Sequence, residues 1–287
     1  MSRPPTVRVA VASRADNVAL IREVLGGLDE VARLGSGLDD VKTAVSEACN
    51  NVVMHAYDGR EGPLEVDLFL LEDELEAVVR DEGNGIGAHE LAEATASVQM
   101  TEPVTGRGLG LAVIGALADV VELRRREPTG IEVAMRFSLP APGRLPGPLS
   151  EPPRFDRPAW TPGAVELALA PASLGTAVLA RMVCAVAARA EFSIDRLSDA
   201  QLVADALAAH VPPALAADVL TVSLRSGRRR IELELGPLRI GGAGQALADS
   251  AIGEIGGLIE RLSDEVEVRE DAGVEYVRLV IVDQSRG

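Results

Sequence analysis

The sequence predicts two α/β sandwich domains, each a mixed, mainly antiparallel sheet with helices on one face. Strand-like alternation and amphipathic helical stripes follow one another through both halves of the 287-residue chain. The second half repeats the order of the first, and a proline-rich segment separates the two. We therefore expect a first domain at residues 1–140, a linker at 141–162 and a second copy of the domain at 163–287.

The elements of the first half follow from their periodicity, taken in order. We expect a strand at 6–12, a helix capped by Asp16 or Asn17, a longer helix at 41–57, paired strands at 64–71 and 75–80, an apolar helix opening near Gly108, and a hairpin at 120–125 and 131–139. The run 124–126, three arginines in that hairpin, is interpreted as a solvated edge. Phosphate steering or partner binding is the less favoured role.

The helix at 41–57 carries the first candidate chemistry. Glu47 and Asn51 lie four residues apart, so they share a face beside the apolar stripe. The carboxylate can accept a proton from a nucleophile, and the amide oxygen can hold a hard cation such as Mg²⁺. Taken alone, the pair is more readily interpreted as two solvated helix residues, because short polar spacings recur by chance.

Two later stretches favour the chemical interpretation, because both suit a purine nucleotide. Asp81 ends a strand, where a carboxylate can accept a hydrogen bond from the adenine amino group, and Gly83 and Gly85 let backbone approach the base. The stretch 105–114 is a glycine-rich loop that opens an apolar helix. Its backbone N–H groups lie at a helix start, where the dipole favours phosphate. The nucleotide residues expected in this loop are Gly106, Arg107, Gly108, Leu109 and Gly110.

These three motifs, E-x-x-x-N, D-x-G-x-G and G-x-G-x-G, resemble the ATP-binding fold shared by gyrase, histidine kinases and MutL-type ATPases. Within that fold, TAVSEACNNVVMHAY and the turn at 119–121 resemble the bacterial anti-sigma factor serine kinases, over roughly residues 6 to 140. The resemblance implies that Glu47 is the general base, that Asn51 is the Mg²⁺ ligand and that Asp81 binds adenine. Ala56 departs from the family pattern, which often has Gly, and the lid at 88–106 does not match the relatives well.

The second copy lacks this chemistry. At a shift of about 156 positions, Pro237 stands opposite Asp81 and Arg239 opposite Gly83. The repeat of the motif helix at 193–211 has no acidic residue followed four residues later by Asn. The glycines at 241–244 carry no neighbouring carboxylate, and a turn is their expected use.

Composition excludes several classes of partner. The formal net charge of −16 argues against direct binding of nucleic acid or anionic membranes. Cys49 and Cys184 have no metal-ligand or C-x-x-C spacing and are interpreted as small buried hydrophobes, and the three histidines show no metal-ligand spacing. The N-terminal residues alternate like a strand and no long uninterrupted apolar run is present, so we expect a cytoplasmic protein.

The resemblance implies an ATP-dependent serine/threonine kinase that phosphorylates an anti-anti-sigma protein and binds a sigma factor. An ATPase is an alternative, in which Glu47 activates water, although such ATPases usually carry a transducer domain that the sequence does not show. A histidine kinase catalytic domain is less favoured, because the sequence shows no phosphoacceptor helix. A third alternative is a partner-binding module that ATP switches. The family's pairing as dimers suggests a homodimer, or a pseudo-dimer made by the second copy within one chain.

Overall fold

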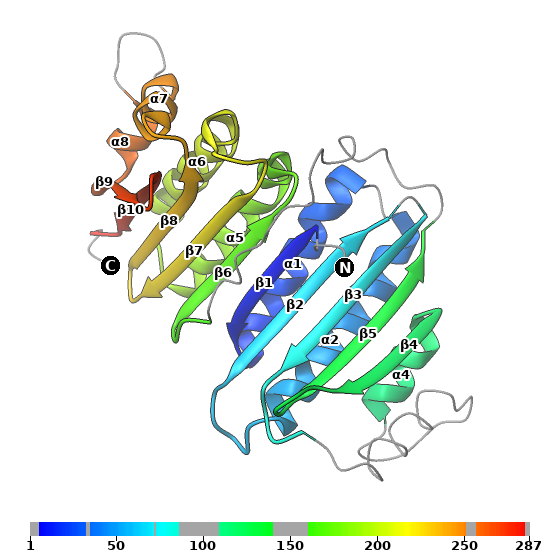
Figure 1. The fold of residues 1–287 in the computed structure, drawn as a ribbon. Helices are drawn as coiled ribbons and strands as arrows, with labels where there is room; N and C mark the ends of the chain where they lie inside the picture. The colour runs from blue at the N-terminus through cyan, green and yellow to red at the C-terminus, as the bar shows by residue number, and fades with distance from the viewer. Residues whose placement is uncertain are drawn as a thin grey trace. The chain divides into compact units, whose positions relative to one another are not determined.

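The computed structural model describes residues 6–32, 35–71, 73–85, 109–139, 160–250 and 257–284. The chain divides into two compact units, one within residues 5–145 and the other containing residues 146–287. Each unit is an antiparallel sheet with helices on one face (Figure 1), which confirms the expected α/β sandwich. Most of the expected linker, residues 141–159, lies outside the described residues.

The first unit is built around five strands in the order β4-β5-β3-β2-β1, and each described pair is antiparallel. Its elements are β1 (Val7–Ala12), α1 (Ala15–Ala32), η1 (Gly35–Gly37), α2 (Leu38–His55), β2 (Pro63–Leu70), β3 (Glu74–Asp81), α4 (Leu109–Leu117), β4 (Val120–Arg125) and β5 (Ile131–Ser138). The helices lie on one face of this sheet (Figure 1), and α2 packs between α1 and α4.

Alternation along the strands places the core of the first unit under these helices. On β2 the side chains of Leu64, Val66 and Leu68 are fully buried, and on α2 so are those of Val41 and Val45. The helical stripe and the strand period therefore meet as the sequence predicts. The pairing of β2 with β3 places Leu64 opposite Asp81, so the candidate adenine residue lies at one end of this core.

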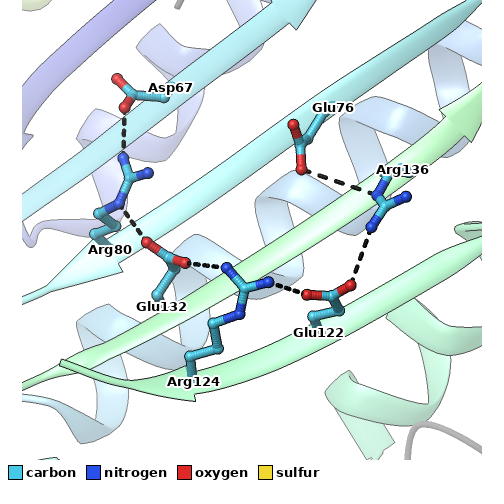
Figure 2. A network of polar contacts seen from close by, with 7 residues as sticks. All are labelled: Asp67, Glu76, Arg80, Glu122, Arg124, Glu132 and Arg136. Carbon is cyan, nitrogen blue, oxygen red and sulfur yellow. Dashed lines mark hydrogen bonds and ion pairs between the residues drawn. The ribbon is translucent and has the colours of Figure 1, made fainter. Parts of the chain in front are cut away.

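The opposite face of the first sheet carries a ladder of alternating charges, which we call the charge ladder (Figure 2). Asp67 is 1% exposed and accepts hydrogen bonds from Arg8 at 2.6 and 2.7 Å and from Arg80 at 2.5 Å. Ion pairs then continue across β5 and β4 in the order Arg80, Glu132, Arg124, Glu122, Arg136 and Glu76. Arg124 is 61% exposed on the edge strand β4, as expected of a solvated hairpin edge, and it is also a member of the ladder.

The second unit has the same succession of strands as the first. Its elements are β6 (Ala164–Leu169), η2 (Ala172–Leu174), α5 (Gly175–Arg189), α6 (Ile194–His210), η3 (Pro212–Ala214), β7 (Leu220–Gly227), β8 (Arg230–Leu238), α7 (Gly242–Asp249), α8 (Leu258–Leu262), β9 (Glu265–Asp271) and β10 (Val274–Val282). Its sheet order, β6-β7-β8-β10-β9, matches β1-β2-β3-β5-β4. Gly241 has a left-handed φ of 80° and α7 begins at the next residue, so the glycines at 241–244 start a helix after a single turn residue.

One apolar helical window in the described residues passes a length and composition test for crossing a membrane. It spans Ala172–Arg189, with a mean hydropathy of 1.4, and 56% of it is buried inside the structure. This window contains α5, whose residues Val178, Met182 and Val183 are fully buried. Such burial is typical of the core helix of a folded domain, so the window is weak evidence for a membrane span.

Candidate functional site

Helix α2 presents Glu47 and Asn51 toward the start of helix α4. A methyl group built on Gly110 of α4 would lie 3.2 Å from Glu47 Oε2 and 3.3 Å from Asn51 Oδ1. Both polar side chains are half-buried, whereas their helix neighbours Ala48 and Cys49 are buried in the core. The structure therefore brings together one residue of the glycine-rich loop and the two chemical residues of α2. A Cβ at position 110 would crowd the oxygens of both.

Asp81 occupies the last position of β3 and is 5% exposed. Its Oδ1 accepts a hydrogen bond of 2.8 Å from the backbone N–H of Gly83. Burial raises the pKa of this carboxyl above its usual value, and hydrogen bonds from the backbone of Gly83 and Ile131 and the charge of Arg126 partly offset the rise. Burial makes the charged form of this carboxyl costly, and the backbone hydrogen bonds offset only part of that cost. A ligand that donates a further hydrogen bond to the carboxylate would therefore be favoured here.

The turn after Asp81 packs tightly against the end of α2. A Cβ on Gly83 would lie 2.1 Å from the backbone oxygen of Ala56, so this position requires glycine. The same oxygen accepts a 3.0 Å hydrogen bond from the backbone N–H of Asn84. Gly85 has a φ of 68°, which also favours glycine. Ala56, the position that departs from the family pattern, is thus a contact residue of the turn.

Two parts of α2 contact different parts of the candidate site. Its C-terminal end, at Ala56, holds the turn that carries Asp81, and its middle carries Asn51 and Glu47 against Gly110. Glu47 and Ala56 are nine positions apart, a rise of roughly 13 Å at about 1.5 Å per residue. An extended ligand with a base at one end and phosphates at the other fits this arrangement.

Sequence reasoning missed three residues that hold the turn. The hydroxyl of Tyr57 accepts a 2.8 Å hydrogen bond from the backbone N–H of Glu82 and donates to the backbone oxygen of Pro63 at 2.5 Å. Arg126 Nη1 donates to the backbone oxygen of Asp81 at 3.0 Å. Thr129 Oγ1 donates to the backbone oxygen of Glu82 at 3.2 Å. Tyr57 lies in the quoted family motif, but no local pattern signals the contacts of Arg126 and Thr129.

Part of the expected site lies outside the described residues. Gly106, Arg107, Gly108 and the whole of the lid at 88–106 are not described, and Leu109 is placed only as the first residue of α4. Among the described residues, no group of three or more His, Cys, Asp or Glu is placed to hold a metal ion. Mg²⁺ commonly binds through one or two protein oxygens together with substrate phosphates, so the Asn51 amide fits the ion only as part of a nucleotide complex.

Comparison with known proteins agrees with this geometry. Residues 11–137 match the model of the histidine kinase-like ATPase domain, the class that the fold and the site define. The serine-protein kinase RsbW of Halalkalibacterium halodurans is 33% identical over 139 residues, 46% of this chain and 83% of that protein. RsbW of Bacillus cereus is 33% identical over 141 residues, 47% of this chain and 86% of that protein.

The chain therefore belongs to the RsbW family of serine-protein kinases. Both matched regions cover less than half of the chain, and the family model ends at residue 137. The mycobacterial sensor histidine kinase MprB is similar at 19% identity, over 48% of this chain and 98% of that chain. Its TM-score of 0.31 is too low to carry an argument.

Proposed function

We propose that this protein is an ATP-dependent serine/threonine protein kinase of the anti-sigma type, with its active site in the first unit. The observation that carries the proposal is the convergence of Glu47 and Asn51 on Gly110. The buried Asp81 turn, anchored at the end of the same helix, supplies the base-binding end. Family membership supports the kinase assignment, because the relatives are named serine-protein kinases.

In this reaction the chain mainly positions groups and neutralises charge. Asp81 would accept a hydrogen bond from the adenine amino group, and the absence of a Cβ at Gly83 lets the turn lie flat against α2. Asn51 would hold Mg²⁺, which neutralises charge on the nucleotide phosphates. Glu47 would accept the proton of the substrate hydroxyl as that oxygen bonds to the γ-phosphorus, while the bond from the γ-phosphorus to the bridging oxygen breaks and ADP leaves. The close approach of α4 at Gly110 keeps the side chains of Glu47 and Asn51 together.

The experiment that tests the catalytic assignment is a single-turnover assay of the Glu47→Gln variant at saturating ATP. The substitution keeps the shape of the side chain and removes the base, so phosphate transfer should fall by about 10²–10⁴-fold while ATP affinity stays near that of the wild type. Asp40→Asn is the matched control, because Asp40 is an exposed residue at the other end of α2. Transfer by Glu47→Gln at the wild-type rate would assign the base to another residue.

The base-binding assignment has a separate test. Asp81→Asn removes the charge that accepts the amino-group hydrogen bond, at a cost of about 1.5–3 kcal/mol, or more than tenfold in affinity. Calorimetric titration of the folded variant with ATP measures this loss. Unchanged ATP affinity would show that Asp81 does not bind the base, whatever the Glu47→Gln assay shows.

The partners follow from the proposed type. We infer that the phosphorylated substrate is a small anti-anti-sigma protein and that a sigma factor is the regulated partner, both in the cytoplasm. Incubation with labelled ATP and each candidate separates this proposal from the alternatives. Label on a serine or threonine of the partner supports a kinase. Phosphate release without labelled partner supports an ATPase, and partner binding that requires ATP without turnover supports an ATP-switched module.

For the second unit we propose a degenerate copy that binds no nucleotide and serves as a built-in mate for the first. Pro237 occupies the position that corresponds to Asp81 in the first copy, and it offers neither a carboxylate nor an N–H. Its backbone oxygen accepts from the N–H of Ala216 at 3.0 Å, and the N–H of Arg239 donates to Ala214 at 2.9 Å. A bridge joins Leu215 to Leu238, which is fully buried. The segment after α6 thus lies along the end of β8, as the residue after α2 lies against the turn that follows β3.

Calorimetry on the intact chain tests this assignment directly. The wild type should bind one ATP per chain, and Asp81→Asn should weaken that binding more than tenfold without exposing a second site. Two ATP molecules per chain would overturn the proposal for the second unit. Sedimentation then separates a pseudo-dimer, which stays a single chain at micromolar concentration, from a homodimer.

A further inference from the structure

Arg126 directly follows β4 and reaches across to the end of β3. Its side chain is half-buried, and its Nη1 donates a 3.0 Å hydrogen bond to the backbone oxygen of Asp81. Its own backbone N–H donates to the oxygen of Gly130 at 3.1 Å, which anchors the arginine in the β4–β5 hairpin. The interpretation of this residue as part of a solvated hairpin edge is therefore wrong.

Tyr57 holds the other side of the same peptide unit. The oxygen of Asp81 and the N–H of Glu82 belong to one planar group. Arg126 binds its oxygen, and the Tyr57 hydroxyl accepts from its N–H at 2.8 Å. The Tyr57 ring is itself confined, since a Cβ on Gly62 would lie 2.2 Å from it. Both polar groups of this peptide are therefore hydrogen-bonded, one to the residue after β4 and one to a residue just after α2. These two hydrogen bonds fix the direction in which the Asp81 side chain points.

The charge of Arg126 also acts on the Asp81 side chain. Among the described residues, the titratable groups that bear on this carboxyl are Arg126, Glu82 and Tyr57. Burial and the charge of Glu82 raise the pKa of Asp81, whereas Arg126 lowers it. Burial also raises the pKa of the Tyr57 hydroxyl, so this group stays neutral and leaves Arg126 as the positive charge on the turn.

We propose that Arg126 is a positioning residue for base recognition, fixing the peptide unit between Asp81 and Glu82 and supplying the positive charge beside the buried carboxylate. This inference rests on the proposed function, in which Asp81 binds adenine. Its consequence is a specific dependence of nucleotide affinity on pH. Asp81 accepts the amino-group hydrogen bond when ionised, so affinity falls as the pH drops through its pKa. Without Arg126 that decline begins at a higher pH.

The variants are Arg126→Gln, Arg126→Lys and Arg125→Gln. Arg125 lies beside Arg126 in sequence and is exposed, so its substitution changes net charge equally and is the matched control. Calorimetry with ATP across a series of pH values should show Arg126→Gln about tenfold weaker at neutral pH, with its acid midpoint moved upward. Arg126→Lys keeps the charge and should restore the midpoint, while recovering only part of the affinity, because it loses the planar donor. Arg125→Gln should match the wild type.

A second readout needs no nucleotide. The amide of Gly83 donates to Asp81 Oδ1 at 2.8 Å, so its ¹⁵N resonance reports the ionisation of that carboxyl. In Arg126→Gln this titration should move to higher pH, and in Arg125→Gln it should not.

The possible outcomes distinguish a failure of the proposed role of Arg126 from a failure of the proposed ATP-binding function. Equal affinity and equal Gly83 titration in the two glutamine variants would overturn the role of Arg126 while leaving ATP binding intact. A purely structural role would weaken binding at every pH and leave the Gly83 midpoint unmoved, and that result also overturns the proposal. Failure of the wild type to bind ATP would overturn the base-recognition role together with the proposed function. If Arg126→Gln does not fold, Arg126→Lys takes its place in the affinity test, and an affinity equal to that of the wild type would overturn the positioning role.

Discussion

Replacing Gly83 by alanine should disable the base-binding turn through contact with Ala56. The added Cβ would lie 2.1 Å from the backbone oxygen of Ala56, 2.7 Å from its carbonyl carbon and 2.8 Å from its Cβ. Ordinary contacts between non-bonded heavy atoms lie at about 3.5–4 Å, so the turn must move away by more than about 1 Å. The obstacle is backbone at the end of α2, which a side-chain rotation does not relieve.

Two hydrogen bonds are lost by a movement of that size. One is the 3.0 Å bond from Asn84 N–H to the Ala56 oxygen, and the other is the 2.8 Å bond from Gly83 N–H to Asp81 Oδ1. A neutral backbone bond contributes about 0.5–1.5 kcal/mol and a bond to a charged group about 1.5–3 kcal/mol. Alanine returns about 0.4–1 kcal/mol by restricting the unfolded chain. The first unit should therefore lose about 1–4 kcal/mol of stability, and ATP affinity should fall at least tenfold.

Differential scanning calorimetry measures the stability of the variant. Titration calorimetry at about 10 °C below its transition measures ATP affinity, because the free energy of unfolding rises steeply enough below the transition to keep the variant folded. Gly37→Ala is the control. No heavy atom lies within 4 Å of a Cβ built at Gly37, and its φ is −76°, so alanine fits there without contact or strain. Binding of ATP by Gly83→Ala within twofold of the wild type would refute the assignment of this turn to the nucleotide.

Three further substitutions test features of the scaffold. Asp67→Asn should cost about 3–5 kcal/mol in the first unit by chemical denaturation, because it leaves Arg8 and Arg80 facing one another without their shared carboxylate; a loss below about 1 kcal/mol would contradict this. Glu275→Gln should destabilise α7 by about 1 kcal/mol, because in the wild type the Glu275 carboxylate accepts hydrogen bonds of 2.8 and 2.9 Å from two backbone N–H groups at the start of that helix. Faster exchange of the α7 amides measures this loss, and unchanged exchange would argue against the cap. Gly244→Ala should stabilise the second unit by about 0.5–1 kcal/mol in the same denaturation assay, since the position is exposed in α7 with no atom within 4 Å; a loss of stability would show that α7 needs the glycine.

Periodicity was sufficient to predict the elements that carry the candidate site. The helical period placed Glu47 and Asn51 on one face of α2, and the strand period put Asp81 at the end of β3. These are local properties, because the backbone geometry of a helix or strand alone decides which residues share a face. The close approach of Gly110 to both α2 residues depends instead on how α4 packs, and only the structure shows it.

The residues that sequence reasoning missed act across elements that are remote in the chain. Arg126 reaches a backbone oxygen 45 positions earlier, and nothing in a run of three arginines distinguishes it from Arg125. The cap on α7 comes from Glu275, which lies beside an irregularity in β10 where the strand register shifts against β8. Side-chain contacts of this kind follow from the relative placement of whole elements, which local periodicity does not encode.

The charge ladder constrains how the first unit can change during evolution. It contains four arginines and four carboxylates, so it is neutral although the whole chain carries a formal charge of −16. Most of its members are shared by two partners of opposite sign, as Figure 2 shows for Glu132 and Glu122. A single substitution inside the ladder therefore deprives two neighbours of one partner each, whereas a matched exchange of two adjacent members preserves the alternation. Across related sequences, substitutions in the charge ladder should accordingly occur together at pairs of adjacent members. The excess acidic residues elsewhere on the surface should be substituted independently of one another.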